Sequence, residues 1–180
     1  MILLISTCRY NFHEYEFVKP ISRVVEKCNV SYDIMRYNEE IRLNKYSGVI
    51  ICGTALKDFD YLNYVDNFKW IVDYKGGVLG ISSGYQILAK IYGNQLEEIE
   101  KIGLYKIRVL RKNILAEKQE FYAYFLHKYA LRNVNRKLIP LAKQNDEICM
   151  FKVRNKKVYG VSFHPEVLNE EIIIKFLRNI

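Results

Sequence analysis

The sequence predicts an α/β fold, with a mostly parallel central sheet flanked by helices and additional antiparallel strands in the second half. In the first half, short and wholly apolar runs alternate with amphipathic helical segments. In the second half, apolar and basic residues alternate, as in half-exposed strands. The chain has 180 residues and half are apolar, which is enough for one core and hardly enough for two. We therefore expect a single domain, residues 1–180.

Four strands are expected in the first half, at Met1–Thr7, Ser31–Tyr37, Gly48–Cys52 and Gly77–Ile81. The first, third and fourth are apolar on both faces, which is typical of parallel strands covered by helices on both sides. Helical spacing of apolar residues predicts the helices between and after these strands. The residues that mark them are Phe17, Ile21, Val24, Val25 and Cys28; then Tyr61, Leu62, Val65, Phe68 and Val72; and then Ile87, Leu88 and Ile91, before a left-handed cap at Gly93.

The second half predicts four more strands and a closing helix. The strands are expected at 105–111, 121–126, 148–153 and 158–163. Asn169 can cap the last helix, because Glu170 and Glu171 follow in its positive first turn.

Composition narrows the class of protein. No apolar run approaches the roughly 20 residues of a membrane span, and Met1–Thr7 lacks the features of a signal peptide, so we expect a cytoplasmic protein. The four cysteines form no CxxC pair, so neither a metal site nor a disulfide framework is indicated. They are expected to be small buried side chains.

The net charge of +8 is spread along the chain. Its densest cluster is Arg132–Lys137, followed by Arg154, Lys156 and Lys157, and no stacking aromatics are regularly interleaved among these residues. Charge runs of this kind favour a solvated face or an anionic protein partner over nucleic acid. We expect a partner to dock there, close to the strands that lead to His164.

The stretch Gly76–Gln86, GGVLGISSGYQ, carries the most specific chemical signal. Gly80 and Gly84 flank Ser82 in a G-x-S-x-G pattern between a buried strand and a helix. Such a strand–elbow–helix projects the central side chain beside backbone N–H groups that can bind an oxyanion. The pattern indicates Ser82 as a candidate nucleophile.

A nucleophile of this type needs a base. His164 closes the strand at 158–163, and Glu166 follows two residues later as a carboxylate able to orient the imidazole. His13 and His127, taken by themselves, are more typical of surface or core histidines. Cys52 also ends a strand and could lie near the same crevice, although a packed thiol is the favoured interpretation.

These residues resemble the class I glutamine amidotransferases, a family with a flavodoxin-like fold and a Cys–His–Glu triad. GGVLGISSGYQ is similar to the family's G-[IV]-C-x-G-x-Q elbow, and Gly160–Glu166, GVSFHPE, to its G-V-Q-F-H-P-E segment. The resemblance runs nearly end to end, and in size the chain is most similar to the free-standing glutaminase subunit of two-subunit GMP synthases. It implies glutamine as ligand, a synthetase partner in purine biosynthesis, and no cofactor.

Carried over by position, the resemblance puts Ser82 where the cysteine nucleophile belongs, His164 at the base and Glu166 at its carboxylate. Gln86 matches the glutamine that helps to shape the substrate pocket. The remaining matched positions differ from the common family residues. They are Ser83 and Tyr85 on the elbow, Thr54 after Gly53 in the G-G-P turn that offers an oxyanion N–H, and Leu126 and Tyr129 around His127 in the segment that meets substrate.

Three interpretations of Ser82 remain open from the sequence. It is an engineered replacement that silences a glutaminase, a natural residue in a chain that keeps a binding or regulatory task, or a working nucleophile in a serine hydrolase. A site built for thiolate is poor with serine, because a serine depends entirely on its base. We therefore expect a glutaminase-type chain, an enzyme by family, with impaired or absent activity.

Overall fold

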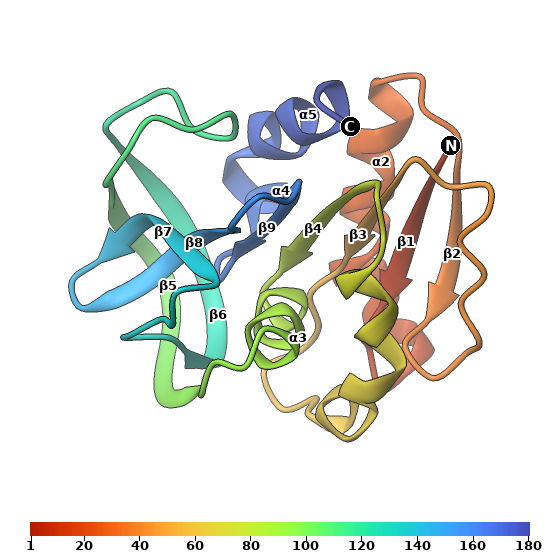
Figure 1. Cartoon of the computed structure of the whole chain (residues 1–180), viewed down its shortest axis with the longest axis horizontal. Helices are drawn as coiled ribbons and strands as arrows, with labels where there is room; N and C mark the ends of the chain where they lie inside the picture. The colour runs from red at the N-terminus through yellow and green to blue at the C-terminus, as the bar shows by residue number, and fades with distance from the viewer.

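The computed structural model describes residues 1–180 and contains one nine-stranded sheet, in the order β2-β1-β3-β4-β9-β8-β7-β5-β6 (Figure 1). The strands are β1 (Ile2–Ser6), β2 (Tyr32–Arg36), β3 (Gly48–Ile51), β4 (Gly77–Ile81), β5 (Glu97–Val109), β6 (Glu120–Ala130), β7 (Leu138–Gln144), β8 (Glu147–Val153) and β9 (Val158–Val161). The helices are η1 (Asn11–His13), α1 (Glu14–Phe17), α2 (Lys19–Lys27), η2 (Asp60–Val72), α3 (Ser83–Ile91), α4 (Pro165–Leu168) and α5 (Glu170–Arg178). No helix is of a length and apolar character that would let it span a bilayer.

The strands β2, β1, β3, β4 and β9 are parallel neighbours. Alternate residues of the central strands enter two separate cores, as the period of two in a strand requires. Leu4, Ile50 and Leu79 face α2 and α5, and Leu3, Val49 and Val78 face α3 and η2. The predicted helix-covered parallel sheet is therefore confirmed.

The strands β8, β7, β5 and β6 extend the sheet with antiparallel pairs. This half of the sheet curls, so that β6 returns to the segment that follows β9. Phe125 forms an isolated bridge with Phe163, and the His164 backbone N–H donates to the Tyr124 carbonyl at 2.8 Å. The curl brings the middle of β6 beside His164.

Several elements differ from the expectation. The helix expected around Tyr61–Val72 is the 3-10 segment η2, with non-helical backbone at Tyr64, and Val72 is 42% exposed. Strand β7 was missed because it contains Pro140, which lacks an N–H; the register with β8 shifts directly after that residue. Asn169 precedes α5 as expected, but its side chain makes no capping bond.

The carboxyl ends of parallel strands share one edge of a sheet, and four segments meet at this edge. They follow β1 (Thr7–His13), β3 (Cys52–Asp60), β4 (Ser82) and β9 (His164). Ligands of open α/β sheets bind outside the carboxyl ends of the strands. The candidate site residues gather there.

A buried ionic cluster lies within the antiparallel half. Glu147 is fully buried, forms an ion pair with Lys101, and accepts a bond from Ser162 Oγ at 2.6 Å. The Nε2 atom of His127 lies 3.5 Å from Glu147 Oε1. Burial by itself raises the pKa of Glu147, but the bonds and charges of His127, Lys101 and Ser162 outweigh burial and hold the pKa below its usual value.

We expect Glu147→Gln to lower the free energy of unfolding by about 3 kcal/mol at pH 7, because Lys101 is left buried without its counter-charge. Since the folded-state pKa of Glu147 is depressed, its contribution is present above the pKa of an unfolded glutamate, about 4.3. That contribution is lost as the pH falls through the folded-state value. Urea unfolding at pH 7, and at a series of pH values below about 4.3, measures both effects.

The matched control is Glu120→Gln, which removes an exposed ion pair with Lys106 on the same part of the sheet. Exposed pairs of this kind are screened by solvent, so no measurable change is expected. Equal stability losses in the two variants would contradict the assignment of Glu147 as a buried counter-ion.

Candidate functional site

The predicted elbow is present at the end of β4. Ser82 joins β4 to α3 with φ 52° and ψ −103°, a conformation that L-residues rarely adopt. The two flanking glycines permit a close approach of helix and strands. A Cβ at Gly80 would lie 2.5 Å from the carbonyl of Gly84, and one at Gly84 would lie 2.3 Å from the Ile51 carbonyl oxygen. The glycines are therefore required by packing against backbone.

Ser82 and His164 do not bond directly; both face one carbonyl oxygen. Ser82 Oγ donates to the Leu126 oxygen at 3.3 Å, and His164 Nε2 lies 3.4 Å from the same oxygen. A Cβ placed on Gly53 would lie 2.6 Å from His164 Cε1 and 3.3 Å from Ser82 Cβ, so the two side chains adjoin the same point. The curl of β6 thus inserts a peptide carbonyl at the predicted nucleophile–base contact.

His164 is oriented by Glu166, as the sequence predicts. Nδ1 lies 2.7 Å from Glu166 Oε1, and both side chains are almost fully buried. A carboxylate accepts hydrogen bonds, so this contact assigns a proton to Nδ1 and leaves Nε2, which faces the Leu126 carbonyl, as the nitrogen that can exchange a proton with Ser82. The second oxygen of Glu166 is buried without a partner. This arrangement can hold a base and stabilise its protonated form.

Two backbone N–H groups beside Ser82 are buried and donate to no protein acceptor: those of Thr54 and Ser83. Unpaired buried donors are uncommon and costly in folded proteins. The side chains of the same residues point elsewhere, because Thr54 Oγ1 donates to Asp58 and Ser83 Oγ faces the Cys52 carbonyl at 3.1 Å. Both residues line one small cavity with Ser82, so their N–H groups are candidates for binding an oxyanion there.

That cavity is nearly closed. It leaves about 10 Å³ open to the centre of a water molecule, which is about what one water needs. Phe59, which lines it, packs edge to face on Tyr129, with ring centroids 5.5 Å apart. Gln86, expected to shape a substrate pocket, accepts from Tyr61 OH at 2.5 Å and donates to the Tyr129 carbonyl at 3.0 Å. Loop 54–59 and β6 must separate before a glutamine side chain can enter.

Two of the expected substrate-side residues direct their polar atoms away from the cavity, although His127 is among the residues that line it. The Tyr85 hydroxyl donates to the Ile148 carbonyl, and the ring packs on Phe151 in the core. The ring of His127 faces the buried ionic cluster, with Nδ1 2.9 Å from the Ser162 carbonyl. A residue on a helix or strand faces one side only, and sequence position alone did not show which side these two residues face.

Sequence reasoning named Leu126 without showing its role in this region, and it missed Asp58. Leu126 acts through its carbonyl, which leaves no signal in a side-chain pattern. Asp58 lies four residues after Thr54 and is buried, whereas a lone aspartate in a loop is ordinarily exposed. His13, assigned to surface or core, bonds to this aspartate.

The cysteines beside the site provide no alternative nucleophile. Cys52 lies at the edge of the site, but it is fully buried and burial raises the pKa of its thiol well above the usual value. Cys8, whose Sγ lies 3.8 Å from the Gly53 carbonyl, also has a thiol pKa raised by burial. A thiol held neutral is a poor nucleophile.

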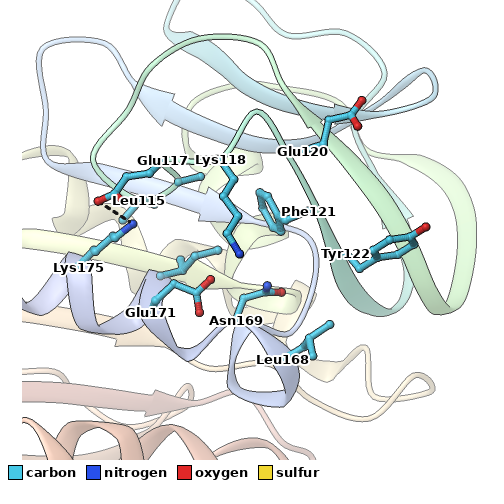
Figure 2. A pocket seen from close by; sticks show the side chains of 12 residues that line it. Leu115, Glu117, Lys118, Glu120, Phe121, Tyr122, Leu168, Asn169, Glu171 and Lys175 are labelled. Atoms are coloured by element: carbon cyan, nitrogen blue, oxygen red, sulfur yellow. Dashed lines mark ion pairs between the residues drawn. The ribbon is translucent and has the colours of Figure 1, made fainter.

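Two surface features lie apart from Ser82. A larger groove of about 730 Å³ separates the segment before β6 from α4 and α5, and the Glu117–Lys175 ion pair spans it (Figure 2). The basic turn 154–157 precedes β9, at the opposite end of that strand from His164. Lys156 and Lys157 donate to the carbonyls of Val72 and Asn179. The basic turn thus adjoins the strand that leads to His164, as expected, but lies at the end of that strand away from the histidine.

Comparison with known proteins shows which proteins this chain is similar to. The family model described as "Glutamine amidotransferase class-I" matches residues 12–180. One subunit of glutamine-hydrolyzing GMP synthase from Methanocaldococcus jannaschii is 31% identical over 175 residues, covering 91% of this chain and 90% of that protein. Glutamine-hydrolyzing GMP synthase from Petrotoga mobilis is 26% identical over 169 residues, which cover 91% of this chain and 33% of the relative. The chain thus spans about a third of that longer protein's length.

Among solved structures, a protein assigned as one subunit of a GMP synthase from Thermoplasma acidophilum superimposes with a TM-score of 0.87. The alignment covers 98% of this chain and 92% of that chain at 19% identity. At this identity the likeness establishes the fold alone.

The strained backbone of Ser82 gives a stability prediction. Replacing Ser82 by glycine should raise the free energy of unfolding by about 1 kcal/mol, because glycine adopts this φ and ψ without strain. Asn155→Gly is the matched control, since Asn155 also has a positive φ of 58° but asparagine tolerates the left-handed region. Thermal unfolding of both variants measures the difference. A Ser82→Gly variant no more stable than the control would show that the elbow is unstrained.

Proposed function

The chain belongs to the class I glutamine amidotransferase family, and from this premise we propose that it is a glutaminase-type subunit of a two-component synthetase. It would hydrolyse the side-chain amide of glutamine to glutamate and supply the ammonia to its partner, with weak or absent activity because Ser82 occupies the nucleophile position. The observation that carries the proposal is the elbow residue Ser82 beside the His164–Glu166 pair, with two unpaired N–H groups lining the same cavity.

Each residue has a distinct step in this reaction. Ser82 Oγ attacks the amide carbonyl carbon of glutamine, and His164 Nε2 takes the hydroxyl proton while Glu166 stabilises the imidazolium. The N–H groups of Thr54 and Ser83 bind the oxyanion. His164 then protonates the departing ammonia and leaves a glutamyl ester on Ser82. A water molecule, deprotonated by His164, hydrolyses this ester to glutamate and restores the serine.

Three features support low activity. A serine hydroxyl is almost wholly protonated near pH 7, whereas a cysteine in such a site is already partly thiolate. The Leu126 carbonyl takes the Ser82 hydrogen bond that His164 would need for catalysis. The cavity also has no room for glutamine until its walls move.

We expect the partner to be a synthetase on a separate polypeptide. The chain covers nearly all of a relative named as one subunit of GMP synthase and a third of a relative named as GMP synthase. We infer that the acceptor of ammonia, a nucleotide precursor in the manner of GMP synthase, is bound by another polypeptide. The partner would lie over the carboxyl edge of the sheet, where the Ser82 cavity is located.

A second candidate function is a non-catalytic binding or regulatory role. It is favoured by the closed cavity and by Gln86, whose amide is fully engaged with Tyr61 and Tyr129. In that case the fold would be kept for its contact with a partner and not for hydrolysis.

Glutamine hydrolysis by the purified chain, with and without a synthetase subunit of two-component GMP synthase, separates these functions. We expect negligible ammonia release by the serine form and at least a tenfold increase in Ser82→Cys, because the thiolate needs less help from His164. His164→Asn in the Ser82→Cys background is the control and should abolish the gain. Brisk release by the serine form would contradict impaired catalysis, and no gain in Ser82→Cys with the synthetase present would favour the non-catalytic role.

A further inference from the structure

We propose that Asp58 is a positioning residue for the turn Gly53–Ala55, acting through the hydroxyl of Thr54 to aim the Thr54 backbone N–H at the Ser82 cavity. The inference rests on the proposed function, because it assigns this N–H to an oxyanion. Asp58 itself would touch no reacting atom.

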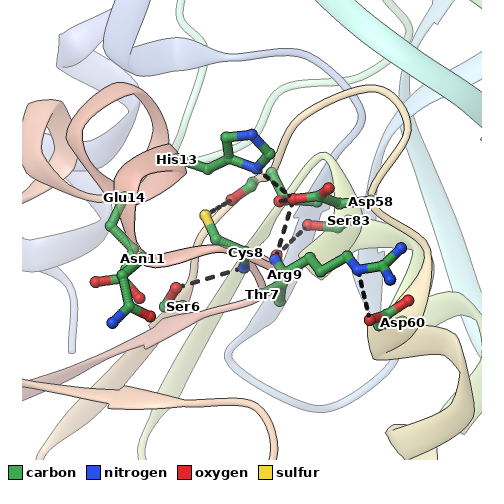
Figure 3. Close-up of polar contacts among 12 residues, drawn as sticks. Ser6, Thr7, Cys8, Arg9, Asn11, His13, Glu14, Asp58, Asp60 and Ser83 are labelled. Carbon is green, nitrogen blue, oxygen red and sulfur yellow. Dashed lines mark hydrogen bonds and ion pairs between the residues drawn. The ribbon is translucent and has the colours of Figure 1, made fainter.

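One oxygen of Asp58 holds three separate donors. Oδ2 accepts from Thr54 Oγ1 at 2.8 Å, from the Arg9 backbone N–H at 3.0 Å, and lies 2.7 Å from His13 Nδ1 (Figure 3). The aspartate side chain is 5% exposed. Three donors on one buried carboxylate oxygen form charge-assisted bonds, which are stronger than neutral ones.

These bonds join the loops that follow two neighbouring strands. Arg9 and His13 come after β1, whereas Thr54 and Asp58 come after β3. The Thr54–Asp58 bond spans four residues, so it closes the loop on itself while His13 and Arg9 hold it to the sheet edge. These bonds therefore fix the Gly53–Ala55 turn both within its own loop and against the edge of the sheet.

The far side of the turn is fixed by contact with the base. A Cβ on Gly53 would overlap His164, so the backbone of Gly53 lies directly against the imidazole. Thr54 stands where the family motif has a glycine, and its side chain must leave the cavity free. The Thr54 hydroxyl is held by Asp58, which lines the same cavity, and the Thr54 N–H donates to no protein acceptor. Because the Thr54 side chain is anchored, the direction of its backbone N–H is restricted.

If Asp58 only held the loop in place, its loss would lower the free energy of unfolding and leave the rate of the chemical step unchanged. Aiming an oxyanion donor changes the binding of the transition state, so its loss lowers kcat and leaves KM nearly unchanged. Loss of one complete oxyanion donor costs about 10²–10³ in kcat, and misdirecting one should cost part of that.

The first test is made in the Ser82→Cys protein with glutamine as substrate. We expect Asp58→Ala to lower kcat at least tenfold with less than a threefold change in KM, and Asp58→Asn to recover part of the loss because its amide oxygen can still accept from Thr54. Asp60→Asn is the matched control, since Asp60 lies on the same loop and pairs with Arg9 at 3.3 Å through an exposed side chain. An unchanged kcat in Asp58→Ala would overturn the proposal.

The second test does not depend on hydrolysis. Amide hydrogen exchange in the unmodified serine protein should be at least tenfold faster across Gly53–Ala55 in Asp58→Ala, and unchanged in Asp60→Asn. If Ser82→Cys has no glutaminase activity, the proposed function fails, and exchange still decides whether Asp58 holds the turn. Exchange in Asp58→Ala equal to that of the Asp60→Asn control would overturn the positioning role.

Discussion

The geometry of the site depends on the close approach of the first turn of α3 to strands β3 and β4. Gly84 lies so near the Ile51 carbonyl, and Gly80 so near Gly84, that neither position has room for a Cβ. Because the helix starts this close to the strand end, the connecting residue must turn within one position, and Ser82 takes a strained conformation to do so. Such strain persists only where the surrounding packing over-determines it. The same approach leaves the Ser83 N–H unpaired beside the elbow.

The second determinant is the curl of the antiparallel half. The bond from the His164 N–H to Tyr124 and the bridge between Phe125 and Phe163 fasten β6 across the end of β9. This attachment explains how a strand distant in the sheet order supplies the Leu126 carbonyl at the nucleophile. It also forms one wall of the cavity, opposite loop 54–59. The register of β6 therefore also controls the access to Ser82.

Three of the departures from the family pattern are accommodated by a specific side-chain contact. The Tyr85 hydroxyl bonds to Ile148, the Ser83 hydroxyl faces Cys52, and Thr54 bonds to Asp58. None of these contacts fills the position between Ser82 and His164.

The parallel half, the elbow and the His164–Glu166 pair could be predicted from the sequence, because each depends on neighbours within a few positions. Apolar runs define β1, β3 and β4, glycines two positions before and after Ser82 mark the elbow, and Glu166 lies two residues after His164, within reach of its ring. The orientation of His127 and Tyr85, the placement of the Leu126 carbonyl and the burial of Asp58 could be seen only in the folded structure. These depend on how strands far apart in sequence curl and pack, and a carbonyl or a side-chain direction leaves no periodic pattern in the sequence.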